Sequence, residues 1–221
     1  VDAASYADGE GGITSADAIT LRTGAVDNRA GFVGAAAALR ASTGEFINRD
    51  GGVVVSRADV DIDTRGALYD NRGGQTLAAR DLAISAGRID NGAGLIRSGE
   101  ATTLHASSVD NANTQGADQG IEARTLRLNA DTLTNTRGAI RTNADATIVS
   151  AGIVDNTAGL ISAMGALRIS DPKAGTATAK ALDIVNTDGT LAAGERLLLD
   201  AAGFSGDGTV VSDKELAIAL S

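Results

Sequence analysis

The sequence predicts an all-β protein, a parallel β-helix of about ten coils, each of about 20 residues in three short strands. Three observations predict this fold. One motif recurs along the chain, several columns of that motif stay in phase across its copies, and apolar residues alternate with the period of two that is typical of strands. A helix needs roughly ten or more periodic residues, and no repeat unit leaves room for one.

An asparagine anchors the repeat. The steps between successive anchor positions are 20, 20, 23, 20, 20, 24, 21, 30 and 19 residues. Stacked amides can bond from coil to coil because each carries a donor and an acceptor, so we expect inward or stacked asparagines. The alternative is a plain turn residue whose side chain lies in water. The anchor positions are Asp8, Asn28, Asn48, Asn71, Asn91, Asn111, Asn135, Asn156, Asn186 and Ser205.

Other columns keep fixed distances from the anchor. Three residues after most anchors stands a glycine, as in Gly11, Gly51, Gly74 and Gly94, where we expect a backbone angle that a Cβ would forbid. Two columns of mostly apolar residues should fill the interior. Two residues before the anchor stand Tyr6, Val26, Phe46, Tyr69, Ile89, Val109, Leu133, Val154 and Ile184. Five after it stand Ile13, Val33, Val53, Thr76, Ile96, Ile140, Ile161, Leu191 and Val210. Eleven and thirteen after it come pairs such as Leu82/Ile84, Leu167/Ile169, Leu197/Leu199 and Leu216/Ile218.

We read residues 1–221 as one repeat segment with insertions. Three extra residues within 48–70 should swell a turn near 63–66, while 71–110 is the most regular part. Polar insertions near 111–120 and 170–180 are candidate binding loops, because insertions in solenoids often gather on a binding face. The alternative is that they are tolerated surface loops. Their candidate contact residues are Asn113, Gln115, Asp118, Asp171, Lys173 and Lys180.

Composition narrows the function classes. The chain is 43% hydrophobic but only 2% aromatic, as expected of a slim core of medium aliphatic residues. Its formal charge of −9 disfavours nucleic acid and anionic membranes as partners. Cysteine is absent, which excludes disulfides and thiol chemistry. No apolar run approaches a membrane span, so we expect no membrane insertion of this segment. No capping segment is evident at Val1 or Ser221, so we expect an excerpt of a longer array.

We find no catalytic constellation and expect no enzyme, no cofactor and no metal. Acidic residues just before the anchors should form an exposed row of like charge rather than a catalytic pair. His105 is the only histidine, it should point outward, and no second His or any Cys could complete a zinc site. The fragment at 206–209 only faintly matches a calcium repeat. The acidic column comprises Asp27, Asp70, Asp90, Asp110 and Asp155.

The repeat resembles that of filamentous haemagglutinin. The clearest copies are Asp70-Asn71-Arg72-Gly73-Gly74, Asp90-Asn91-Gly92-Ala93-Gly94 and Asp155-Asn156-Thr157-Ala158-Gly159, each followed by alternating apolar residues. The resemblance covers essentially the whole chain, although the copies at Asp8 and Ser205 lack the asparagine. It implies a right-handed β-helix rod in a large exoprotein of the two-partner secretion pathway. It also implies a Gram-negative cell-surface or secreted location and export through an outer-membrane transporter that a domain outside this chain would engage.

The leading hypothesis is therefore a structural stalk that extends an adhesin or a contact-dependent growth-inhibition toxin. An alternative is an adhesive module whose inserted loops bind a receptor or glycan on a host or target cell. A third, from the use of β-helices by polysaccharide lyases and hydrolases, is a carbohydrate-active enzyme. That third reading would need a groove with close carboxylates, which the repeat columns do not place.

Overall fold

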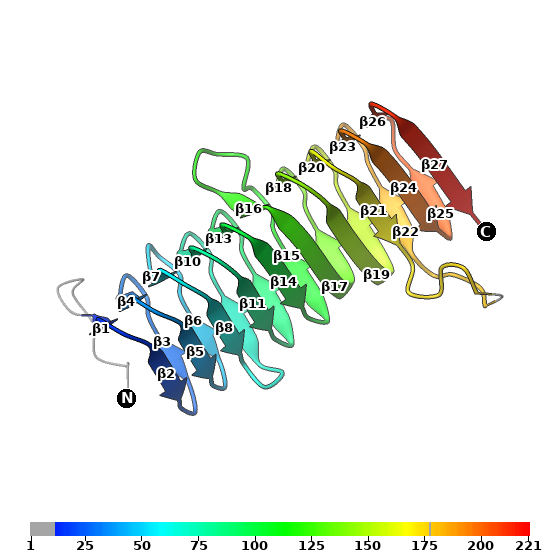
Figure 1. Cartoon of the computed structure of the whole chain (residues 1–221). Helices are drawn as coiled ribbons and strands as arrows, with labels where there is room; N and C mark the ends of the chain where they lie inside the picture. Colours follow the sequence, from blue (N-terminus) through cyan, green and yellow to red (C-terminus); the bar gives the residue numbers. More distant parts are fainter. Residues whose placement is uncertain (1–11, 177) are drawn as a thin grey trace.

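The computed structural model describes residues 12–176 and 178–221, which form a parallel β-solenoid of ten coils (Figure 1). These residues contain strands and turns but no helix, and therefore no helix able to span a membrane. Tyr6, Asp8 and Gly11, which the repeat places in its columns, lie outside the described residues.

Each coil contributes strands to three parallel ladders, which we call the first, second and third sheets. The first sheet contains β1 (Ile13–Ser15), β4 (Phe32–Ala35), β7 (Val53–Ser56), β10 (Gln75–Ala78), β13 (Leu95–Ser98), β16 (Gly120–Ala123), β18 (Ala139–Thr142), β20 (Leu160–Ala163), β23 (Thr190–Ala193) and β26 (Thr209–Ser212). The second contains β2 (Ile19–Arg22), β5 (Leu39–Ser42), β8 (Val60–Asp63), β11 (Leu82–Ser85), β14 (Ala101–His105), β17 (Thr125–Thr134), β19 (Ala146–Asp155), β21 (Leu167–Ser170), β24 (Arg196–Ala201) and β27 (Glu215–Leu220). The third contains β3 (Val26–Asp27), β6 (Phe46–Ile47), β9 (Leu68–Asp70), β12 (Arg88–Asp90), β15 (Ser108–Asp110), β22 (Asp183–Val185) and β25 (Gly203–Ser205). The long strands β17 and β19 run through both the second and third sheets and join them.

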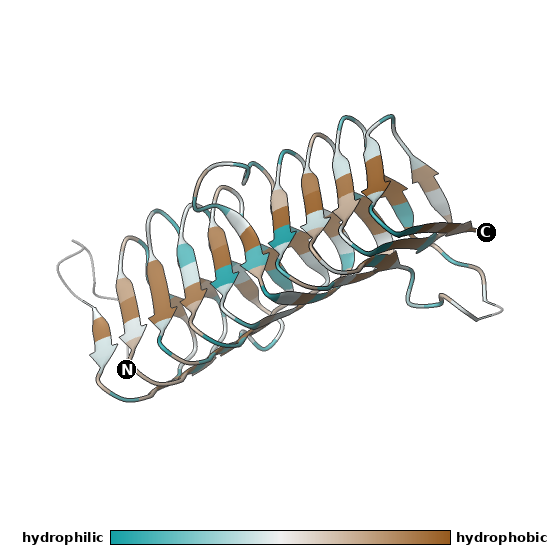
Figure 2. Ribbon diagram, turned by 45° about the horizontal axis from the view of Figure 1, so that its top comes forward, coloured by the Kyte–Doolittle hydropathy of each residue, from teal (hydrophilic) through white to brown (hydrophobic). Residues whose placement is uncertain are grey.

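The core is a stack of aliphatic columns. Ile96 pairs in register with Thr76 and Ile121, and each of these side chains is fully buried. The column two residues before the anchor is also buried throughout the described residues. Figure 2 shows hydrophobic bands recurring from one strand to the next. Because the spacing between coils is constant, each inward side chain packs on its equivalent in the next coil, and the core needs few large aromatic residues.

Two column assignments from the sequence are wrong by one residue. Val54, not Val53, pairs with Thr76 and is fully buried. One of the three extra residues of that coil lies in the turn at 49–52, while the other two lie in the turn after β8. In the last coil, Ser205 pairs with Val185, which precedes Asn186, so Gly206 takes the anchor place.

The last coil differs from the others in exposure. Leu216 and Ile218 lie in register with Leu197 and Leu199, yet they are 50% and 46% exposed. The residues they pair with are fully buried because coils stack on both of their sides. An apolar column thus ends at β27 with one side open.

Candidate functional site: the asparagine ladder, its charged border and two inserted loops

The anchor asparagines form one continuous ladder. In each of seven successive steps, the Nδ2 of one asparagine donates to the Oδ1 of the next, at 2.6 to 2.8 Å. Each Nδ2 also donates to the carbonyl of the first residue in the first-sheet strand of the next coil, as Asn71 does to Leu95 O at 3.0 Å. All eight side chains are at most 1% exposed. They are Asn28, Asn48, Asn71, Asn91, Asn111, Asn135, Asn156 and Asn186.

The ladder couples each coil to its successor. A buried amide without partners is costly, and the shortest bond of each Nδ2 goes to the next coil, as from Asn71 to Asn91 Oδ1 at 2.7 Å, with a second to the same coil, as to Leu95 O at 3.0 Å. The bond to its own coil is longer, at 3.4 Å from Asn71 to Gly74 O, so a coil satisfies its amide fully when its neighbour is folded. This adds a polar coupling between coils to their apolar stacking.

The glycine three residues after the anchor is required because a side chain there would clash with its neighbours, and not because its backbone adopts a special angle. A Cβ built at Gly94 would lie 2.2 Å from Asn71 O and 2.7 Å from Asn91 Oδ1. Gly74, Gly138, Gly159 and Gly189 meet the same obstacles, and none has a positive φ. Our expectation of a forbidden angle at this column is therefore wrong: the ladder itself occupies the space of the side chain.

The left-handed angle falls one residue earlier, where glycine is not required. Ala30, Ala93, Ala158 and Asp188 adopt φ values of 50°, 54°, 51° and 52°. Gly51 is the exception in the glycine column, with φ 83°, because the extra residue in its turn makes Gly52 the close-contact position. In this turn, the residue with the left-handed angle is therefore followed by the residue that has no room for a Cβ.

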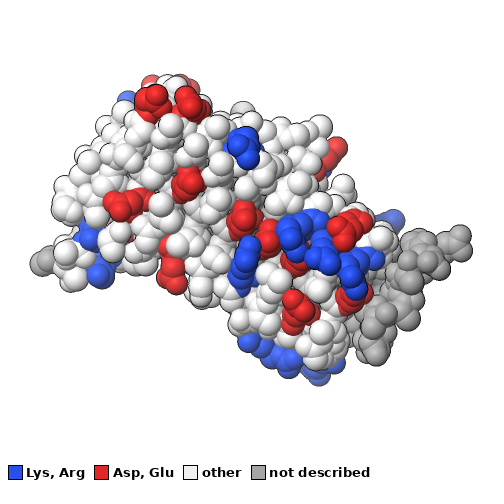
Figure 3. Space-filling view, turned by 180° about the vertical axis from the view of Figure 1, so that it is seen from behind, with Lys and Arg blue, Asp and Glu red and all other residues white. Residues whose placement is uncertain are grey.

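The aspartates before the anchors do not form an exposed row of like charge, contrary to the sequence interpretation. Asp70 is 2% exposed and Asp90 is 7% exposed. One oxygen of each accepts the backbone N–H two residues later, as Asp110 does from Ala112 at 2.9 Å. The second oxygen of Asp70 accepts from Arg72, whereas that of Asp155 accepts from the Thr136 hydroxyl. In Figure 3 basic side chains lie among acidic ones on this solenoid.

Arginines interleave with the aspartates across coils. Arg72 Nη2 lies 2.7 Å from Asp70 Oδ2, and Arg72 Nε lies 3.5 Å from Asp90 Oδ2. Burial raises the pKa of Asp70, but the bonds and charge of Arg72, with Arg49, bring that pKa below its ordinary value. The pKa of Asp90 is raised, by burial and by the neighbouring Asp110. Arg88 Nη2 lies 3.1 Å from Asp90 Oδ2, but the residue after Asn91 is Gly92, so this turn has no counterpart of Arg72 to bind both Asp90 and Asp110.

The loop at 112–119 lies on the edge where the third sheet turns into the first. Thr114 is fully buried, and its hydroxyl donates to Asn111 O and accepts from Ala139 N. Asn113 Oδ1 accepts from Arg137, and Gln115 Nε2 reaches Ala158 O at 2.7 Å. Asp118 is exposed, as are Asn113 and Gln115, and it pairs with Arg97 at 3.0 Å. Much of this loop is therefore tied down to later coils.

The loop at 171–182 joins the second and third sheets on a different edge. Asp171 is buried and its carboxylate accepts the backbone N–H groups of Lys173, Ala181 and Leu182 at 2.6 to 2.9 Å. Burial opposes these bonds, yet they hold the pKa of Asp171 below its ordinary value. Asp171 thus closes the neck of the loop and seats Leu182 in the core.

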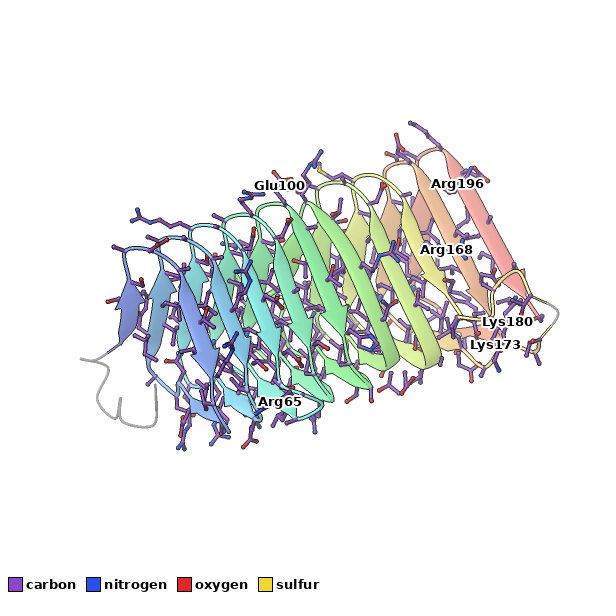
Figure 4. The ribbon with its side chains drawn as sticks, turned by 60° about the horizontal axis from the view of Figure 1, so that its bottom comes forward. Arg65, Glu100, Arg168, Lys173, Lys180 and Arg196 are labelled. Carbon is purple, nitrogen blue, oxygen red and sulfur yellow. The ribbon has the colours of Figure 1, made fainter. Side chains whose placement is uncertain are left out.

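The two lysines of that loop differ. Lys173 is exposed and reaches only Ala179 O within the loop. Lys180 lies against the solenoid: its Nζ is 2.7 Å from Asp200 Oδ1 and donates to Ala201 O and Ala219 O of successive coils. Figure 4 shows Arg65 along the same edge of the solenoid as these lysines. The two candidate loops lie on different edges of the solenoid, so the structure does not bring them together on one face.

Sequence reasoning missed Arg65. It lies in the swollen turn after β8 with φ 53°, and its guanidinium donates to Thr43 O at 2.9 Å and Thr23 O at 2.8 Å. It mirrors Lys180, since each cation from an enlarged turn binds carbonyls of two successive coils. A basic residue inside a lengthened turn is the sequence signal that could have indicated both.

Sites for chemistry are sparse in the described part of the chain. His105 is exposed, and no three His, Asp or Glu side chains among residues 12–176 and 178–221 are placed to hold a metal ion. Asp59, Asp61 and Asp81 line an open hollow of 340 Å³ on the outer face of the second sheet, together with Arg40.

Comparison with known proteins agrees with the repeat geometry. The family model for the haemagglutinin repeat matches residues 1–69, 56–120, 121–171 and 173–219. The chain belongs to the haemagglutinin repeat family. Its members are structural repeats of secreted, adhesin-like proteins of the cell surface, and the repeat is in general not enzymatic. No curated protein and no solved structure matches the chain.

Proposed function

We propose that this chain is a stalk segment of a large exoprotein, secreted by the two-partner route to a Gram-negative cell surface. There it would hold an adhesive or toxin domain away from the cell. The observation that supports this most is the unbroken asparagine ladder, which runs through eight coils without a gap for a ligand. Each coil adds about 4.8 Å of length at the cost of only about 20 residues. The same proposal includes an outer-membrane transporter as the export partner and no catalytic role.

A deletion in register tests the stalk. Residues 71–110 make up two coils, and removing them joins Asp70 to Asn111, which restores every column. We expect a folded, cooperative protein whose long dimension in small-angle X-ray scattering falls by about 10 Å. Within the full exoprotein, export and attachment to target cells should persist. Loss of attachment by a folded, exported protein would contradict a purely spacing role.

A deletion out of register provides the matched control. Removing 71–100 takes out one and a half coils, so the asparagine and apolar columns no longer meet their partners. We expect this shorter deletion to prevent folding, as judged by far-UV circular dichroism. If both deletions fold equally well, the ladder does not set the register.

A second candidate function is adhesive binding through the loop at 171–182, which projects from the solenoid (Figure 1). Its exposed residues, including Pro172 and Lys173, are available for contact. Deleting the whole loop would also remove Asp171 and Lys180, which hold the neighbouring coils. The informative variant therefore replaces only 172–179 with a short Gly-Ser link. Saturable binding of the segment to host or target cells, lost in this variant at unchanged melting temperature, would establish the adhesive role.

A further inference from the structure

The outer face of the first sheet carries an exposed aromatic ring. Phe32, in β4, is 39% exposed, whereas Phe46 and Tyr69 are fully buried. The chain has only five Phe and Tyr, since it contains three Phe and two Tyr. An aromatic side chain in solvent is therefore a notable use of a scarce residue type.

The ring packs against its own strand. A methyl group built at Gly34 would be 2.5 Å from the Cε1 and 2.8 Å from the Cζ of Phe32, so the ring rests directly against this glycine. In the same outward column, Val55, Leu77 and Arg97 carry side chains that would prevent such packing. The ring is thus held against the backbone at Gly34, and the rest of its surface accounts for its exposure of 39%.

Polar groups lie beside the ring in a hollow of 410 Å³, which Ser15, Ala36, Val55 and Arg57 also line. Ser15 Oγ accepts the N–H of Asp17 at 3.1 Å, so its own O–H remains able to donate. Arg57 is exposed, and no ion pair joins it to another residue in the described ranges. The hollow therefore combines an exposed aromatic ring, a hydroxyl donor and a cation.

A peptide strand does not suit this place. Both edges of β4 are already hydrogen-bonded, to β1 and to β7, so no backbone is free for an added strand. A pyranose suits it better, because its axial C–H groups form an apolar face and its rim carries hydroxyls. A sugar carboxylate would find a partner in the Arg57 guanidinium, the only cation among the described residues that line the hollow.

We propose that this hollow is a subsite for an acidic pyranose, with the sugar's C–H face on Phe32, a hydroxyl at Ser15 and its carboxylate at Arg57. The subsite lies on the sheet face and is separate from both inserted loops. It does not depend on the stalk role, because a spacer and a binding segment would each retain it.

Saturation-transfer NMR on the purified chain tests the subsite. The probes are a disaccharide ending in glucuronic acid and its neutral counterpart ending in glucose. We expect transfer to the C–H protons of the terminal glucuronate. The exchange Arg57→Gln should reduce the preference for the acidic probe by roughly 2- to 5-fold, the range of an exposed ion pair, while leaving binding of the neutral probe unchanged.

Three further variants decide whether the ring face carries the binding. Phe32→Ala should abolish transfer, and Gly34→Ala should weaken it by displacing the ring without removing it. Phe32→Leu retains apolar area but no flat face, so it should also abolish transfer. Arg127→Gln, which changes an exposed arginine of the second sheet, is the matched control and should bind like the native chain. Melting curves confirm that each variant is folded.

The proposal is overturned by any of three results: no transfer to either probe, transfer that survives Phe32→Ala, or full binding by Phe32→Leu. The last of these would indicate a site for an apolar protein surface, for which aliphatic and aromatic side chains serve alike.

Discussion

Five of the eight ladder asparagines directly follow an aspartate in the sequence, yet the asparagine column and the aspartate column follow different rules. The asparagines are uniformly buried and bond mainly to the column itself and to backbone carbonyls. The aspartates vary from buried to half-buried, and the two most buried, Asp70 and Asp90, each bind one arginine of their own coil and one of the preceding coil. An amide stacks on its own copy because it is both donor and acceptor, whereas a carboxylate can only accept. The first column is therefore self-sufficient, and the second needs a partner of opposite charge.

Exchanging the chemistry of the two columns should have the largest effect. Asn91→Asp removes the donor to Asn111 Oδ1 and Gly120 O and buries a charge among acceptors. We expect a loss of about 3–5 kcal/mol in the free energy of unfolding at pH 7, comparable to leaving a buried charge unpaired. Chemical denaturation measures it. Asn91→Ala is the control and should cost about 1–3 kcal/mol, because it loses the bonds without adding a charge. Equal costs for the two variants would mean that the amide is not enclosed as described.

The second-largest loss of stability is expected at Gly94, where the ladder leaves no room for a Cβ. Gly94→Ala places a methyl group 2.2 Å from Asn71 O, in a place where neither the backbone nor the buried amide can easily move. We expect a cost of about 3 kcal/mol, at the upper end of overpacking. Gly92→Ala in the same turn is the matched control, since its nearest neighbour would be 3.5 Å away. Similar melting temperatures for the two variants would show that the column tolerates side chains.

The aspartate column should show smaller effects that depend on pH. We expect Asp70→Asn to cost about 1–2 kcal/mol at neutral pH, because it weakens a charge-assisted bond to a half-exposed arginine. The pKa of Asp70 is lowered by folding, so its contribution is present above the ordinary aspartate pKa and is lost as pH falls through the lower, folded value. Denaturation of both proteins between pH 7 and pH 2 should therefore show their difference shrinking in acid.

Asp90 should behave in the opposite sense. Folding raises its pKa, so its ionised form opposes folding, and protonation on moving down through the raised pKa adds stability relative to neutral pH. Asp90→Asn should therefore lower the free energy of unfolding only slightly at pH 7. Because the native chain gains stability as Asp90 becomes protonated, the difference in stability between the two proteins should grow as the pH falls. A variant that loses as much stability as Asp70→Asn at pH 7 would contradict this assignment.

The sequence alone predicts the features that a single coil determines, but it does not predict those that depend on contacts between two coils. The period, the three strands and the inward column through Ile89 follow from residue type and spacing, and the structure has them. The burial of Asp70 does not, because it requires knowing that Arg49 and Arg72 from adjacent coils reach the same carboxylate. The displacement of Val53 by Val54 depends on which turn takes up an extra residue, and spacing alone leaves that open. For the same reason the two inserted loops could be located along the chain but not assigned to different edges.

The smallest effect should be a gain. Gly92 stands where the two preceding coils of the ladder have Arg49 and Arg72, and a Cβ there meets only ordinary contacts at 3.5 Å or more. Gly92→Arg would place a guanidinium between Asp90 and Asp110, as Arg72 lies between Asp70 and Asp90. We expect a gain of about 0.5 kcal/mol at pH 7 and low salt, and a lower pKa for Asp90, measurable by NMR titration. Gly92→Gln, of similar length but uncharged, is the control. If arginine and glutamine perform alike, or if added salt leaves the gain intact, then the aspartate column does not depend on charge pairing between coils. The contrast with the self-sufficient asparagine column would then fail.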